Sequence, residues 1–320
     1  MNIEAVMTAI LSAALLSAVP LVLASTGEAI GERAGLLNLG TEGIMLVGAF
    51  SGFWVALRTE SLALGLLGGA AAGCFAGALF GIGCVVIGAD QVLLGLGFTL
   101  AGGGLTAFLF RELFGSSQPL LPTSAGRPFN TLAEHLPVIG PGVFGQKWFF
   151  YVAWLIVFGA ELVMRHTTFG LRIRAVGESP QAVDAVGISV TRTQCFAATI
   201  AGCLAGLGGA GLSVMELGFF QPNVTLGLGF IAIALAMLGR WTPWRIAVIA
   251  IMFGLLRGLG SGLQLTRWDV SPDLLQLLPY VGVIVALILT GKGLTMPSAL
   301  GQTYAQRRRR RPATGSATQE

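Results

Sequence analysis

Charged residues are scarce in this chain of 320 residues. They make up 11% of the sequence, against about 25% in soluble domains, while 54% is hydrophobic and the mean hydropathy is +0.79. This composition excludes an ordinary soluble domain and indicates a protein that crosses a membrane several times. The apolar runs are rich in Leu, Ala and Gly without strand-like alternation, so they predict α-helices rather than a β-barrel.

The chain also has few residues that could carry chemistry. Its two histidines are scattered, and its four cysteines lie in apolar runs at spacings that suit no metal site (Cys74, Cys84, Cys195 and Cys203). No nucleophile–base arrangement suits an intramembrane enzyme. We therefore expect a transport protein that has no catalytic residue and binds no metal or cofactor of its own.

Nucleotide-binding loops are missing as well. No G-x-x-x-x-G-K-[ST] motif occurs in the sequence. The run GLGGAG at 206–211 has the spacing of a dinucleotide loop, but no strand precedes it and it lies within an apolar run. Any use of ATP must then belong to a partner protein.

Apolar windows near the roughly 20 residues needed to span a bilayer dominate the rest of the chain. They predict an all-α polytopic membrane protein with eight to ten transmembrane helices, in a domain over residues 1–295. A Pro- and Gly-rich stretch at 113–146 is expected to form an outer loop, and 296–320 a basic, disordered cytoplasmic tail. The windows lie at about 5–24, 43–57, 61–88, 91–111, 147–164, 193–214, 224–239, 244–262 and 273–291.

Arginine and lysine are concentrated in three places: 165–192, the pair Arg240 and Arg245, and the tail from Lys292 to Arg311. Four helices between residue 193 and the tail would bring all three to one face, and the positive-inside tendency makes that face cytoplasmic. The arginine run of the tail is expected to anchor the topology and attract anionic lipid, with no role in binding nucleic acid.

Small residues recur at helical spacing in two of the windows. Residues four apart lie on one face of a helix, so these glycines predict a flat stripe on which a neighbouring backbone can pack closely. A sliding surface for a moving helix is the alternative. The stripe consists of Gly65, Gly69, Gly73, Gly77 and Gly81, with Gly202 and Gly206 on a second helix.

A polar stretch at 25–43 interrupts what would otherwise be one apolar region. Charged groups at membrane depth usually face a cavity or a partner, so we expect a broken helix whose side chains line or gate a path. The alternative is an ordinary loop at the membrane surface. If the stretch is helical, Glu28 and Glu32 share a face, and Arg33 could neutralise one of them. The residues are Glu28, Glu32, Arg33, Asn38 and Glu42.

The polar segment 165–192 is predicted to be the contact site for a cytoplasmic partner protein. Glu161 should pair with Arg165 one turn later, and Gly170 should end the membrane helix. A short helix should follow, with its start capped by Ser179 and its end at a left-handed glycine. A helix lying on the lipid interface is the alternative. The predicted contact residues are Glu178, Ser179, Pro180, Ala182, Asp184, Ala185, Gly187 and Ile188.

These segments also carry a resemblance. The pattern Gly-x5-Ala-Val-Gly-Glu-Ser-Pro-x-Ala-x3-Val-Gly-Ile at 170–188 resembles the coupling loop of ABC-importer permeases for branched-chain amino acids, simple sugars and nucleosides. GERAGLLNLGTEGIMLVGAF at 31–50 resembles the second permease subunit of basic-membrane-protein-type nucleoside importers. GCLAGLGGAGLSV at 202–214 follows in the family's order.

The resemblance implies a type II-like permease in a bacterial inner membrane. It implies a second, usually non-identical permease, ABC ATPases that carry ATP and Mg²⁺, and a periplasmic or lipid-anchored solute-binding protein. The solute would be a nucleoside, a purine or a simple sugar. The alternative is a secondary transporter driven by an ion gradient, with a proton on Glu28, Glu32 or Glu42. Against it, the second half shows no corresponding polar interruption.

Overall fold

A computed structural model describes residues 3–121, 125–133, 140–264, 272–290, 296–302 and 304. All regular structure in these ranges is helical. The elements are α1 (Ile3–Arg33), α2 (Thr41–Thr59), α3 (Leu62–Gly81), η1 (Ile82–Ile87), α4 (Gln91–Phe114), α5 (Asn130–Ala133), η2 (Gly140–Phe144), α6 (Trp148–His166), α7 (Thr168–Glu178), α8 (Pro180–Ala185), α9 (Val190–Ala210), η3 (Gly211–Leu217), α10 (Leu228–Leu238), α11 (Pro243–Gln264) and α12 (Pro272–Thr290).

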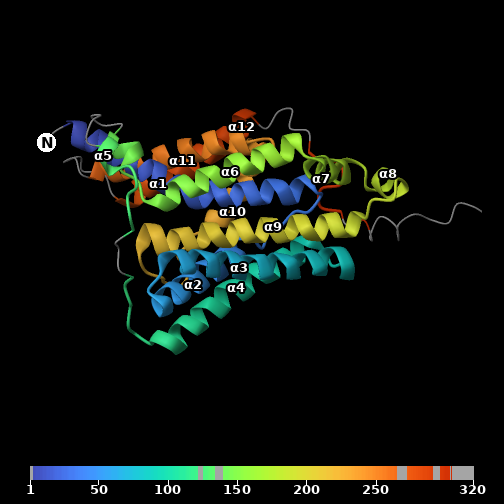
Figure 1. The fold of residues 1–320 in the computed structure, drawn as a ribbon, viewed down its shortest axis with the longest axis horizontal. Helices are drawn as coiled ribbons and strands as arrows, with labels where there is room; N and C mark the ends of the chain where they lie inside the picture. The colour runs from blue at the N-terminus through green and yellow to red at the C-terminus, as the bar shows by residue number, and fades with distance from the viewer. Residues whose placement is uncertain are drawn as a thin grey trace, which may run out of the picture.

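The long helices lie side by side along the longest axis of the molecule (Figure 1). α5 and the start of α1 lie at one end of this bundle, and α7 and α8 project from the other. If α8 faces the cytoplasm, α1 therefore begins on the outer side.

The prediction of an all-α polytopic protein is confirmed. Within the described ranges, six helices are long and apolar enough to cross a membrane, namely those over Met7–Arg33, Leu62–Ile87, Gln91–Phe114, Trp148–His166, Val190–Leu217 and Pro243–Gly260. The expected eight to ten spans are reached only if some of α2, α10 and α12 also cross.

Glycines bring α3 and α9 into backbone contact. A Cβ atom on Gly73 would lie 2.6 Å from Gly206 Cα, and one on Gly77 would lie 2.5 Å from Ala198 O. In the other direction, a Cβ on Gly202 would lie 2.6 Å from Gly77 Cα. These glycines therefore act as the small residues that allow membrane helices to approach closely.

The same device joins α11 to α1. A Cβ on Gly258 would lie 2.6 Å from Ile10 O, and one on Gly254 would lie 3.0 Å from Ala14 C. α1 runs toward α7, whereas α9 runs away from α8, so the two long helices have opposite directions (Figure 1). The packing of α3 on α9 therefore corresponds to the packing of α11 on α1, and the two helix pairs are inverted relative to each other.

Two predicted helix boundaries are wrong. α1 does not break at residue 25 but continues through Glu28 and Glu32 to Arg33, and the non-helical stretch is 34–40. The membrane helix α6 does not end at Gly170 but at His166, because Thr167 Oγ1 accepts a hydrogen bond from Gly170 N and starts α7. The predicted pair between Glu161 and Arg165 is confirmed.

Replacing Gly73 by alanine is expected to destabilise the protein by about 1–3 kcal/mol, the usual range for overpacking. The added methyl group would meet the backbone of Gly206, which cannot move aside as a flexible side chain could. Thermal unfolding in detergent measures the effect. Gly97→Ala on α4 is the control, because no atom lies within 4 Å of a Cβ at Gly97. Equal melting temperatures for the two variants would contradict the packing role.

Candidate functional site

Two non-helical segments inside the helix bundle both adjoin the first turn of α2. The first, 34–40, joins α1 to α2, and the second, 218–227, joins η3 to α10. The start of α2 packs against the middle of α4, where a Cβ on Gly43 would lie 2.7 Å from Thr99 Cα. The start of α10 packs against the start of α2, since a Cβ on Gly229 would lie 2.5 Å from Glu42 Cα.

Glu42 holds the second segment in place. Its Oε1 accepts hydrogen bonds from Thr225 Oγ1 (2.5 Å) and Gly227 N (2.8 Å), and its Oε2 accepts one from Gly229 N (2.6 Å). Both carboxylate oxygens are thereby engaged at the first turn of α10. An acid at this position also suits the positive end of a helix dipole.

Glu28 holds the first segment in a similar way. It accepts hydrogen bonds from Asn38 N (3.0 Å) and Thr41 Oγ1 (2.7 Å). Neighbouring helices add further bonds. Leu37 N donates to Gln91 Oε1 of α4, and Gln194 Nε2 of α9 donates to Ala34 O. The loop is therefore fixed by side chains from three helices, as backbone away from water requires.

The far end of α10 is held by the end of α1. Trp241 Nε1 donates to Glu32, and Arg33 Nη2 donates to Arg240 O at 3.2 Å. The expectation that Arg33 neutralises Glu28 or Glu32 is wrong, because its guanidinium bonds to this carbonyl and forms no ion pair with either acid. Both ends of α10 are thus attached to segment 28–42.

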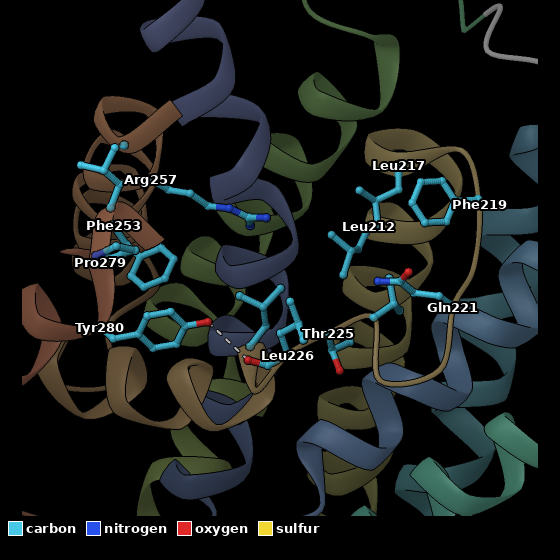
Figure 2. Close-up of a pocket in the computed structure, with 14 residues that line it drawn as sticks. Leu212, Leu217, Phe219, Gln221, Thr225, Leu226, Phe253, Arg257, Pro279 and Tyr280 are labelled. Atoms are coloured by element: carbon cyan, nitrogen blue, oxygen red, sulfur yellow. Dashed lines mark hydrogen bonds between the residues drawn. The ribbon is translucent and has the colours of Figure 1, made fainter. Parts of the chain in front are cut away.

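A cavity of about 340 Å³ adjoins the second non-helical segment, between η3, α11 and α12 (Figure 2). The Arg257 side chain extends into it, and Tyr280 Oη donates to Leu226 O at 3.4 Å. None of these residues is among those predicted from the sequence. The sequence marks this region only by Gln-Pro-Asn at 221–223, between two apolar windows. The lining comprises Leu212, Leu217, Phe219, Gln221, Val224, Thr225, Leu226, Leu228, Phe253, Arg257, Gly260, Leu275, Pro279 and Tyr280.

α8 presents a small apolar surface at the end of the bundle. Pro180 occupies its first turn, Val183 is buried, and Ala182, Ala185 and Val186 are exposed, the last to 72%. The helix is followed by Gly187 with φ of +79°, a left-handed conformation as predicted. The predicted cap is wrong, because the Ser179 side chain makes no hydrogen bond there.

A C-terminal strap, which we define as residues 296–302 with Tyr304, ties α7 and α8 together. Ala299 N donates to Gly177 O (2.8 Å), Ser298 Oγ to Glu178 Oε2 (3.1 Å), and Tyr304 Oη to Asp184 Oδ2 (2.7 Å). The predicted disordered tail is wrong for this part, since Ala299 is fully buried. Residues 305–320, with the arginine run, lie outside the described residues.

α7 in turn touches the end of α1. A Cβ on Gly177 would lie 2.9 Å from Arg33 C, and one on Gly35 would lie 3.2 Å from Ala299 O. The exposed surface of α8 is therefore joined through two backbone contacts to the first non-helical segment.

Comparison with known proteins identifies the family of this chain. Residues 10–288 match the family described as branched-chain amino acid transport system / permease component. The chain belongs to this family. It is a multi-pass permease subunit of an ABC importer, and the family predicted from the sequence motifs is confirmed.

Three curated relatives resemble this permease over most of both chains. The putative glucose ABC transporter permease protein TsgC13 of Haloferax volcanii is 37% identical over 88% of this chain and 84% of its own. The nucleoside permease NupC of Lactococcus lactis is 32% identical (95% and 99%), and the guanosine permease NupQ of Bacillus subtilis is 30% identical (97% and 100%). No solved structure matches.

The permease family decides against the ion-driven alternative, but the prediction that the second half lacks a polar interruption is wrong. The second half contains one, 218–227, at the place corresponding to 34–40 in the first half. In the sequence this segment lies between two apolar windows of ordinary length, so the hydropathy pattern does not mark it.

Glu42→Gln is expected to destabilise the permease by about 1–3 kcal/mol, the cost of leaving a buried donor without an acceptor. The amide can accept on one oxygen only, so its NH₂ group would face either Gly229 N or Gly227 N. Thermal unfolding measures the loss. Glu60→Gln, at the exposed end of the same helix, is the control and should leave the melting temperature unchanged. A stable Glu42→Gln protein would refute the role of Glu42 as the cap of α10.

Proposed function

We propose that this permease forms one half of a solute pathway in a bacterial inner membrane and pairs with a second, non-identical permease. Two relatives come from each of three organisms, which supports such a pair. They are NupC and NupB of Lactococcus lactis, NupQ and NupP of Bacillus subtilis, and TsgC13 and TsgB13 of Haloferax volcanii.

A separate cytoplasmic ATPase would supply the energy by seating on α8. The exposed Ala182, Ala185 and Val186 give a face small enough to enter a groove on another protein. ATP and Mg²⁺ would bind to that subunit, and a periplasmic or lipid-anchored binding protein would deliver the solute at the opposite end of the bundle. The proposed partners are thus the second permease, the ATPase, the binding protein and lipid, with no nucleic acid among them.

The contacts of α7 provide a route for coupling. A push on α8 would reach Gly177, which abuts Arg33, and the C-terminal strap, which abuts Gly35. From there it would reach segment 34–40 and Glu42, whose carboxylate holds the start of α10. In this proposal the five residues Glu28, Glu32, Arg33, Asn38 and Glu42 act as a frame that moves or holds α10.

The solute is proposed to be a nucleoside, a purine or a simple sugar that passes the 340 Å³ cavity. This volume lies within the range of about 300–1,000 Å³ typical of small-molecule pockets. Phe253 and Tyr280 offer ring faces, with centroids 6.3 Å apart, and Gln221 offers hydrogen-bonding groups for hydroxyls. Flat bases and sugars both suit this combination.

Ala182→Trp combined with Ala185→Trp should abolish recovery of an ATPase subunit when the permease is purified in mild detergent. Two indoles on the exposed face of α8 would prevent it from entering a groove sized for alanines. Ala101→Trp, on the exposed face of α4 within the membrane, should leave recovery unchanged. Full recovery with the α8 variant would refute the seat on α8.

Tyr280→Leu should lower solute uptake by about tenfold, because stacking of a base on an aromatic ring is worth about 1–3 kcal/mol. Tyr280→Phe keeps the ring, loses only the 3.4 Å hydroxyl contact, and should stay near wild type. Uptake of labelled guanosine and of labelled glucose by cells that carry the whole importer measures this, and unlabelled competitors define the class. Undiminished uptake by Tyr280→Leu would place the path elsewhere.

A further inference from the structure

A second cavity, of about 270 Å³, lies at the α7–α8 end of the bundle and is unusually basic. It lies where the ends of α1, α6 and α7 meet the turn between α10 and α11. The end of α7 contributes Glu178, the only acid among the described residues of the lining. The lining comprises Arg33, Arg165, Glu178, Arg240, Trp241, Thr242, Arg245 and Pro297.

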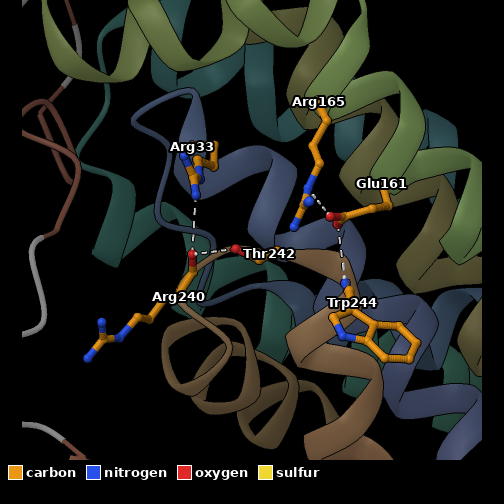
Figure 3. Close-up of polar contacts among 6 residues, drawn as sticks. All are labelled: Arg33, Glu161, Arg165, Arg240, Thr242 and Trp244. Carbon is orange, nitrogen blue, oxygen red and sulfur yellow. Dashed lines mark hydrogen bonds and ion pairs between the residues drawn. The ribbon is translucent and has the colours of Figure 1, made fainter.

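The arginines of this cavity exceed the acids that could neutralise them. Among the described residues, Arg165 pairs with Glu161, whose other oxygen accepts Trp244 N at 3.2 Å (Figure 3). Arg33 uses Nη2 on Arg240 O, and its Nε is buried without a hydrogen-bond partner. No acid in the described part of the chain forms an ion pair with Arg33, Arg240 or Arg245. Guanidinium groups gathered in this way match a phosphate group, which they bind through paired N–H donors.

Two exposed apolar stripes lead to the rim of the cavity. On α6, Leu155, Phe158 and Leu162 are exposed at helical spacing, and Arg165 continues the same stripe. On α11 the stripe begins at Trp244, which is 65% exposed and precedes Arg245; it continues through Val248, Met252, Leu255 and Leu259. Each stripe thus ends at an arginine, and one ends at a tryptophan typical of the membrane–water interface.

We propose that the cavity binds the phosphate of an anionic phospholipid from the cytoplasmic leaflet, with the acyl chains lying along α6 and α11. A free phosphate would use the arginines but leave both apolar stripes uncovered, so the lipid accounts for more of the surface. Basic pockets at the cytoplasmic ends of transmembrane helices have the right position and charge for such headgroups. The proposal rests on the proposed function only in taking the α8 end as cytoplasmic.

A bound headgroup would act as a brace. The cavity lies between Glu178, next to the coupling helix, and Arg33, which holds the turn before α11. A phosphate there would attract arginines from α1, α6 and α11 at once and resist the separation of these elements. Anionic lipid would thereby stabilise the end of the permease on which the ATPase is proposed to act.

Native mass spectrometry of the full chain, purified alone and exchanged into phosphatidylglycerol or phosphatidylcholine mixed micelles, tests the proposal. Wild type should retain phosphatidylglycerol in preference to phosphatidylcholine. The double variant R165Q/R245Q should retain roughly thirtyfold less, the order expected when two cations near an anionic headgroup are removed. R165K/R245K keeps the charge and should retain most of the lipid. R58Q/R111Q removes the same charge at the other end of the bundle and should bind as wild type does.

Two outcomes would overturn the proposal. The first is equal phosphatidylglycerol retention by wild type and R165Q/R245Q. The second is a rise in melting temperature with inorganic phosphate alone that matches the rise with phosphatidylglycerol, which would assign the cavity to a free anion. Because the chain is tested without ATPase or solute, failure of the coupling or substrate proposals leaves this result unaffected.

Discussion

Backbone that leaves a helix within a membrane must find its hydrogen bonds inside the protein, and this requirement organises the centre of the molecule. Segments 34–40 and 218–227 both leave helical geometry there. Glu28 satisfies one of them and Glu42 the other. The position of α10, the wall of the 340 Å³ cavity and the start of α2 all depend on these two carboxylates, because most of the groups that they serve are buried, among them Asn38, Thr41 and Thr225.

The glycine contacts set limits on how the permease could move. α3 and α9 touch backbone to backbone, as do α1 and α11, so each pair can shift only as a unit. Among the parts outside these pairs are α7, α8, the C-terminal strap, segment 34–40 and α10. They form a continuous series of contacts from the exposed face of α8 to Glu42. A rigid frame and a separately attached half-helix are what a pathway that opens to alternate sides requires.

Much of the fold could be predicted because apolar length and local spacing determine it. The apolar windows, the left-handed Gly187 and the pair of Glu161 with Arg165 all depend on neighbours a few residues away. The continuity of α1 through Glu32 could not be predicted, because its partner Trp241 lies 209 residues further along the chain. The C-terminal strap escaped prediction for the same reason, since its residues are ordered by α7 rather than by their own sequence.

The acids in the first helices illustrate how the same residues can suggest different functions. In the sequence, Glu28, Glu32 and Glu42 are typical of proton carriers in an ion-driven transporter. In the structure each accepts hydrogen bonds from backbone or side-chain donors, and Glu42 accepts three. A proton on Glu42 would oppose one of those donors and loosen the start of α10. Carboxylates used in this way hold helices in place, which agrees with the proposal that the energy for movement comes from an ATPase at α8.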